Sequence, residues 1–209
     1  MERSDEEQLE QLKEWWRRNG PGLMLGAALA ITLFAVWWGY NTWQERSAQA
    51  AAVAYAEYLD AERRGADLNR LEVLADRLRS EHSASGYAAL AAMRLARQQV
   101  SAGTQAEAVE TLGWLVDHAA QRPTAELARL RQARALADDD PEGAVGLLQR
   151  EVSAGFRAAY AELRGDLLVD LGRKEEAAAA YREVLAVNGL APHTRELVEI
   201  KLRAAESPA

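Results

Sequence analysis

The stretch RGDLLVDLGRKEEAAAAYREVLAVN, residues 164–188, has the pattern of two helices joined at Gly172. Alanine, leucine, glutamate and arginine dominate it, and all four residue types favour helices. Small residues stand at Gly165 and Ala177, and the bulky Tyr181 follows Ala177 by one helical turn. Small residues occur where two helices cross closely, and a large side chain beside them fills the gap. The stretch therefore predicts a closely packed helical hairpin.

The same pattern recurs upstream. A column of alanines and, one turn later, a column of bulky residues repeat with steps of 36 and 33 residues: Ala108, Ala144 and Ala177; Leu112, Leu148 and Tyr181. This spacing resembles the tetratricopeptide repeat, a helix–turn–helix unit of about 34 residues. We therefore predict an all-α protein in which α-hairpins stack into a superhelix.

The three copies match the repeat pattern to different degrees. The third matches best, the first turns at Gly103, and in the second Asp139-Asp140-Pro141 replaces the turn glycine. An acidic run could suggest a cation site, but a helix N-cap before Pro141 is the simpler interpretation. Residues 47–82 fit a further, degenerate hairpin, and residues 193–206 fit a terminal helix that covers the end of the stack.

Ahead of the repeats lies a long apolar stretch. Residues 19–44 carry no charge, and about 20 apolar residues are enough to cross a membrane as a helix. Tryptophan and tyrosine, which favour the membrane–water interface, flank the stretch on both sides: Trp15 and Trp16, then Trp37, Trp38, Tyr40 and Trp43. We expect a transmembrane helix at 20–44, after an amphipathic tail at 1–19.

The basic residues predict the orientation of this span. Four lie upstream, whereas only Arg46 lies shortly downstream, and the basic flank of a span stays in the cytoplasm. We therefore expect a cytoplasmic tail and a periplasmic domain at 45–209. A cleaved signal is the rival interpretation, because Ala48-Gln49-Ala50 resembles a cleavage site. The apolar stretch is longer than an ordinary signal core, and we expect it to be retained.

Gly22, Gly26 and Ala30 place three small residues on one face of the span. Close helix–helix contact within a membrane requires such small residues. Glycine is also common in spans without a partner, so a helix contact at this face and an unpaired span both remain possible interpretations.

The composition argues against several functions. The net charge of −7 does not favour nucleic acid, and the absence of cysteine excludes disulfides and thiolate metal sites. The three histidines, His82, His118 and His193, are far apart in the sequence, each near a predicted helix end. Since enzymes need a nucleophile with a base, paired acids or a metal cluster, we expect no enzyme, no cofactor and no metal.

The order of segments along the chain resembles that of the YfgM-like family. These segments are a tail ending in NG, the Trp-flanked span, and then SAQAAAVAY, GYAALAAMRLARQ, LARLRQAR and LRGDLLVDLGRKEEAAAAY. Its members are ancillary subunits of the bacterial Sec translocon, with a tetratricopeptide-like periplasmic domain on an inner-membrane anchor. The resemblance implies two partners, the Sec translocon and a membrane-anchored periplasmic chaperone of the prolyl-isomerase type. It also implies assistance to newly exported proteins. An anchored scaffold for cell division or envelope assembly is the alternative.

The first helix of each repeat usually lines the concave side of such a superhelix, where partners bind. Transferring the repeat pattern puts a mixed apolar and charged set on that side: Leu90, Met93, Arg97 and Val100; Glu126, Arg129 and Leu136; Glu162, Asp166 and Val169. The apolar members could equally pack in the core, whereas the charged members should not be core residues.

Overall fold

The computed structural model describes residues 2–207, and within this range all regular elements are helices. The expected all-α fold is therefore confirmed. The chain forms two compact units, one up to Ala50 and one from Ala51 onward. The boundary falls inside the first helix, α1 (Glu2–Arg63), which belongs to both units.

The first unit is a single stretch of α1. This stretch is long and apolar enough to cross a membrane. Its most apolar 18 residues have a mean hydropathy of 1.8, and none of them is buried. The large apolar side chains along it, such as Ile31 and Trp38, are exposed. An apolar helix without a buried face is unfavourable in water, and this favours a lipid environment for it.

The tail and the span are not separate helices. We expected the tail to end at residue 19 and a new helix to begin at residue 20, but α1 continues across this boundary and through Pro21 without a break. Proline removes one backbone N–H from the helical ladder. The side-chain amide of Asn19 donates a hydrogen bond to the Trp15 carbonyl oxygen at 3.1 Å, one turn earlier.

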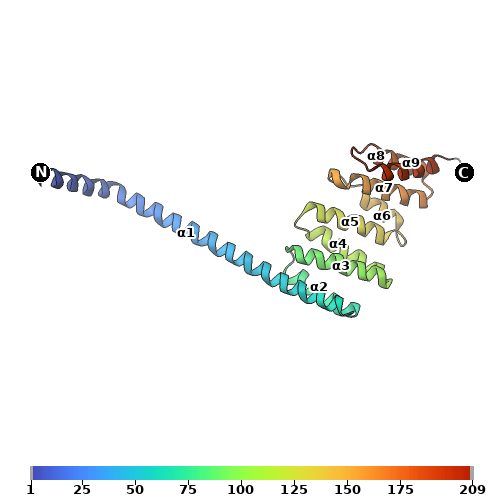
Figure 1. Cartoon of the computed structure of the whole chain (residues 1–209), viewed down its shortest axis with the longest axis horizontal. Helices are drawn as coiled ribbons and strands as arrows, with labels where there is room; N and C mark the ends of the chain where they lie inside the picture. The colour runs from blue at the N-terminus through green and yellow to red at the C-terminus, as the bar shows by residue number, and fades with distance from the viewer. Residues whose placement is uncertain (1, 208–209) are drawn as a thin grey trace. The chain divides into compact units, whose positions relative to one another are not determined.

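The second unit is a stack of antiparallel helices in chain order (Figure 1). After the end of α1 come α2 (Leu68–Glu81), α3 (Gly86–Ala102), α4 (Gln105–His118), α5 (Arg122–Leu136), α6 (Pro141–Leu148), α7 (Ala154–Asp170), α8 (Lys174–Leu185) and α9 (Pro192–Glu206). The expected hairpin over 47–82 is formed by the end of α1 and α2, and the expected terminal helix is α9. Three hairpins, α3–α4, α5–α6 and α7–α8, lie between them.

The turns follow the sequence signals. Gly103 and Gly172 end α3 and α7 with positive φ angles of 81° and 72°, a conformation that disfavours residues with a Cβ. The second hairpin turns without glycine. Asp140 caps α6 there, and its carboxylate accepts a hydrogen bond from the Gly143 N–H at 2.9 Å. Pro141 occupies the first turn, so the predicted N-cap is confirmed.

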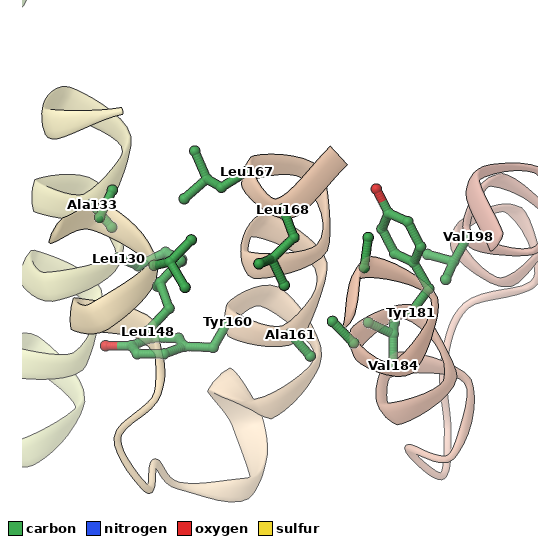
Figure 2. Close-up of a cluster of buried hydrophobic side chains, with 14 of the residues drawn as sticks. Leu130, Ala133, Leu148, Tyr160, Ala161, Leu167, Leu168, Tyr181, Val184 and Val198 are labelled. Carbon is green, nitrogen blue, oxygen red and sulfur yellow. The ribbon is translucent and has the colours of Figure 1, made fainter. Parts of the chain in front are cut away.

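The core is a chain of small clusters between neighbouring hairpins. Alanines such as Ala108 and Ala177 are fully buried and let the helices approach closely. The largest cluster joins α5, α6, α7, α8 and α9, and Figure 2 shows the Tyr181 ring next to Val198 within it. Each hairpin therefore packs directly on the hairpins before and after it.

Candidate partner-binding surface

One face of α3 is open. Leu90, Arg97 and Val100 are exposed on α3, and half of Leu90 is open to solvent, whereas Met93 is half-buried and packs against the core beside them. Residues spaced three and four apart share a helix face. The repeat pattern therefore placed this first group on a common surface.

A groove of about 690 Å³ begins on this surface and crosses three hairpins. Its walls are mostly apolar, and they come from the first helices of the hairpins and from the α4–α5 turn. The main lining side chains are Tyr87, Leu90, Met93, Leu127, His118 and Phe156. Apolar grooves with a few polar groups at the edge are typical of binding sites.

Arginines lie beside the apolar wall. The Arg131 Nη1 atom on α5 is 3.3 Å from the Met93 Sδ atom on α3, so the guanidinium reaches the wall of the groove. Arg97 follows Met93 by one turn of α3, and Arg134 follows Arg131 by one turn of α5. All three arginines are exposed. Arg131 therefore places one positive charge against the apolar wall of the groove.

The predicted residues of the second copy do not join this surface. Glu126 is buried, with 2% of its surface exposed. It accepts hydrogen bonds from the Ser153 N–H and from Arg122 Nε, both at 2.8 Å, and from the Ser153 hydroxyl. Burial raises the pKa of Glu126, but these bonds outweigh it and the net shift is downward. The expectation that Glu126 is not a core residue is therefore wrong, because its carboxylate holds the α6–α7 connection.

Arg129 and Leu136 lie on another side of α5. Leu127 lines the groove and Arg129 is two residues further on, which on a helix is a rotation of about 200°. Arg129 instead lines a separate hollow with Arg150 and Glu151. Leu136 packs against the core. On α5, the residues that share the groove side are Leu127 and Arg131.

The predicted residues of the third copy form an ion-pair cluster. Lys201 of α9 lies 2.8 Å from a Glu162 oxygen and 2.9 Å from an Asp166 oxygen of α7. Burial lowers the pKa of Lys201, but the two acids outweigh it and raise the pKa overall. Val169 is exposed on the same face of α7. These acids join α7 to α9, at a distance from the groove, which α7 lines through Phe156.

A second polar cluster attaches the end of α1 to α3. The Glu62 carboxylate accepts hydrogen bonds from Arg94 at 2.6 Å and from Gln98 at 3.0 Å, while Arg97 is 3.5 Å away. Burial raises the pKa of Glu62, yet these donors outweigh it and lower the pKa overall. The contact orients α3, the helix that carries the first wall of the groove.

The small residues of the span, Gly22, Gly26 and Ala30, are exposed in the first unit. A Cβ added at either glycine would meet no atom within 4 Å. This face therefore has the room that a second helix would need, and contact there remains a prediction.

Among the side chains that the structure describes, those of residues 9–207, no group of three or more His, Asp or Glu is placed to hold a metal ion. His118 stacks on Trp114 at 4.8 Å between ring centroids, and Arg79 lies over the same Trp at 5.6 Å. The sequence did not single out Tyr87, Leu127, Arg131 or Phe156. Their common surface depends on how three hairpins stack, which no local pattern encodes.

Comparisons with known proteins agree with this architecture. A family model described as a tetratricopeptide repeat-like domain matches residues 13–207. The chain is also 26% identical, over 200 residues, to the ancillary SecYEG translocon subunit of Escherichia coli strain K12, and the match covers 95% of each chain. The resemblance inferred from the sequence is thereby confirmed. No solved structure matches the chain.

Proposed function

Because the chain belongs to the tetratricopeptide repeat-like domain family, we propose that it is a membrane-anchored protein-interaction module of the Sec translocon, without a catalytic site. The observation that carries this proposal is the apolar groove across three hairpins. It is open to solvent, Arg131 contacts its wall, and it lies in the unit that follows, along the chain, an apolar stretch long enough to span a membrane. Stacked helical hairpins use such surfaces to bind other proteins.

The relative's name supports the choice of partner. That protein is an ancillary subunit of SecYEG, and the similarity extends over the span as well as the hairpins.

The proposed location is the inner membrane, with the N-terminus in the cytoplasm and the hairpins in the periplasm. The positive charges ahead of the span support this orientation. On the outer side of the channel, the module would bring emerging proteins to a membrane-anchored chaperone of the prolyl-isomerase type. A scaffold for cell division or envelope assembly is the alternative function.

The orientation is tested by fusing reporters after the last residue. A reporter active only in the periplasm should be active, whereas a cytoplasmic reporter should not. Activity of the cytoplasmic reporter alone would place the hairpins on the wrong side for every function proposed here.

The partners are tested by photo-crosslinking in membranes. A photoreactive residue at Tyr87 probes the groove, one at Met24 probes the span, and one at Arg157 serves as an exposed control outside the groove. Translocon or chaperone adducts from Tyr87 support the proposal. Adducts with division proteins instead would support the scaffold, and translocon adducts from Met24 alone would move the contact to the span.

A further inference from the structure

We propose that the terminal helix α9 is a self-association surface, through which two copies of the chain pair with their α9 helices antiparallel. The surface consists of Leu197, Ile200 and Ala204, with Glu196 and Arg203 beside them. In such a pair the apolar residues of the two copies meet along one seam, and Glu196 of each copy lies near Arg203 of the other. This inference goes beyond the proposed function and does not depend on the groove.

The outward face of α9 is apolar where the last helix of a stack should be polar. Val198 and Ala205 of α9 are buried against the rest of the stack, which ends at this helix (Figure 1). On the other side of the helix, Leu197 and Ile200 remain 49% and 51% exposed, and Ala204 is exposed one turn further on. Terminal repeats need a polar outer face to stay soluble. The exposed apolar stripe on α9 therefore indicates that another surface covers it.

The spacing of these residues is that of a coiled-coil seam. His193, Leu197, Ile200 and Ala204 follow one another by four, three and four residues. Such alternating steps keep side chains on one side of a helix, where they pack against the same pattern on a second helix. The seam extends over most of α9, so the helix that covers it should be of similar length. A second copy of the chain supplies such a helix with the same pattern.

The charges beside the seam favour the antiparallel orientation. Among residues 9–207, α9 forms ion pairs only through Lys201 and Glu206, which leaves Glu196 and Arg203 free. Glu196 and Arg203 lie seven residues apart on the same edge of the seam. In an antiparallel pair the ends of the seam exchange places, so Glu196 meets Arg203 twice by symmetry. In a parallel pair Glu196 would instead approach Lys201, which two acids of α7 already bind.

The contact is small, and this sets the conditions under which it forms. One helix of 15 residues from each copy is expected to bury less than the roughly 1,200 Å² of a typical specific complex. Pairing would therefore depend on a high local concentration. An anchor in a shared membrane provides such a concentration, so the test is made on the full chain in membranes.

Disulfides can report which residues of the two copies meet, because the chain contains no cysteine. One tagged copy carries His193→Cys and a second copy, with a different tag, carries Ala204→Cys; both positions are exposed. In the antiparallel pair each cysteine lies about 16 Å along the seam from its own counterpart, beyond the reach of a disulfide. Mild oxidation should therefore give roughly fivefold more mixed dimer than dimer of either variant alone. Arg157→Cys, at an exposed position of α7, is the control and should give no dimer.

Charge reversals then test the pairing itself. Glu196→Arg and Arg203→Glu should each lower the yield of mixed dimer by about tenfold, because two contacts between opposite charges become contacts between like charges. Both reversals in one chain restore the opposite charges and should restore the dimer, a rescue that misfolding cannot produce. Arg157→Glu is the matched control and should leave the yield unchanged. Thermal melts check that each variant is folded.

The outcomes decide what covers α9. Mixed dimers that are lost on single reversal and recovered on double reversal would support a second copy. Disulfides mainly between identical variants would indicate a parallel pair and overturn the proposal. The absence of a dimer in membranes, a double reversal without recovery, or disulfide capture of a different protein in place of the dimer would overturn it too. None of these outcomes bears on the groove, since α9 does not line it.

Discussion

The ring of Tyr181 covers Gly165. A Cβ at Gly165 would stand 2.5 Å from the Tyr181 Cε1 atom, far inside contact distance, so α7 and α8 approach closely only because residue 165 has no side chain. The Tyr181 hydroxyl donates a hydrogen bond to Asp166 at 2.8 Å, and Asp166 also binds Lys201. This pair of residues therefore connects the close crossing of α7 and α8 with the terminal helix α9.

Gly165→Ala should destabilise the hairpin domain by about 1–3 kcal/mol, because the added methyl overlaps a buried ring that has little room to move. Urea unfolding followed by circular dichroism measures the change. Gly146→Ala is the matched control, because a Cβ at that exposed helical position meets no atom within 4 Å. Equal stabilities for the two variants would contradict the close crossing.

Ala177→Trp should cost a similar amount, about 1–3 kcal/mol, since Ala177 is fully buried and an indole there must push α8 from its neighbours. The melting temperature is the measurement. The exposed neighbour Ala179 provides the control as Ala179→Trp. An unchanged melting temperature in Ala177→Trp would refute the repeat assignment for this hairpin.

Glu126→Ala should cost about 1–3 kcal/mol, because it leaves the half-buried Ser153 N–H without its acceptor. Arg129→Glu, by contrast, should have a small effect on the free energy of unfolding, within about 0.5 kcal/mol. Neither change should alter crosslinking from Tyr87 in the groove. A loss of these crosslinks in folded Arg129→Glu would return that residue to the docking surface.

The Glu62 cluster predicts a dependence on pH. Because the pKa of Glu62 is lowered by folding, its contribution to stability is present above the pKa of the unfolded chain. It is lost as the pH falls through the lower pKa of the folded state. Glu62→Gln should therefore be less stable than the parent at pH 7 by about 1–2 kcal/mol, with the difference shrinking in acid. A difference that stays constant down to pH 3 would disagree with this account.

The apolar stretch of α1 should remain attached as an anchor. The protein should stay with membranes after an alkaline wash, because the exposed apolar face is stable only in lipid. N-terminal sequencing of the membrane-bound protein distinguishes an anchor from a signal. A mature chain that begins at Ala51 would show that Ala48-Gln49-Ala50 is a cleavage site.

The helical class, the apolar stretch and the repeat were all readable from local sequence. Gly103, Gly172 and Asp140 mark turns because backbone conformation and capping depend on neighbouring residues alone. Gly165, Ala177 and Tyr181 could be matched as a set because their spacing along the chain reflects one helix crossing. The exposed face of α3 could be predicted for the same reason, because helical rotation alone places Leu90 and Arg97 on one side of the helix.

Which side of α5 lines the groove depended on tertiary structure. The second hairpin turns at Asp140 instead of a glycine. In this hairpin the repeat pattern predicted that Glu126 and Arg129 share the exposed face of α3, but in the structure neither residue lies there. Glu126 is buried because Ser153, 27 residues away, supplies its hydrogen bonds. Arg131 borders the groove because α5 packs beside Met93 of α3. Such relationships join residues distant in the chain, so only the packing of one hairpin against the next determines them.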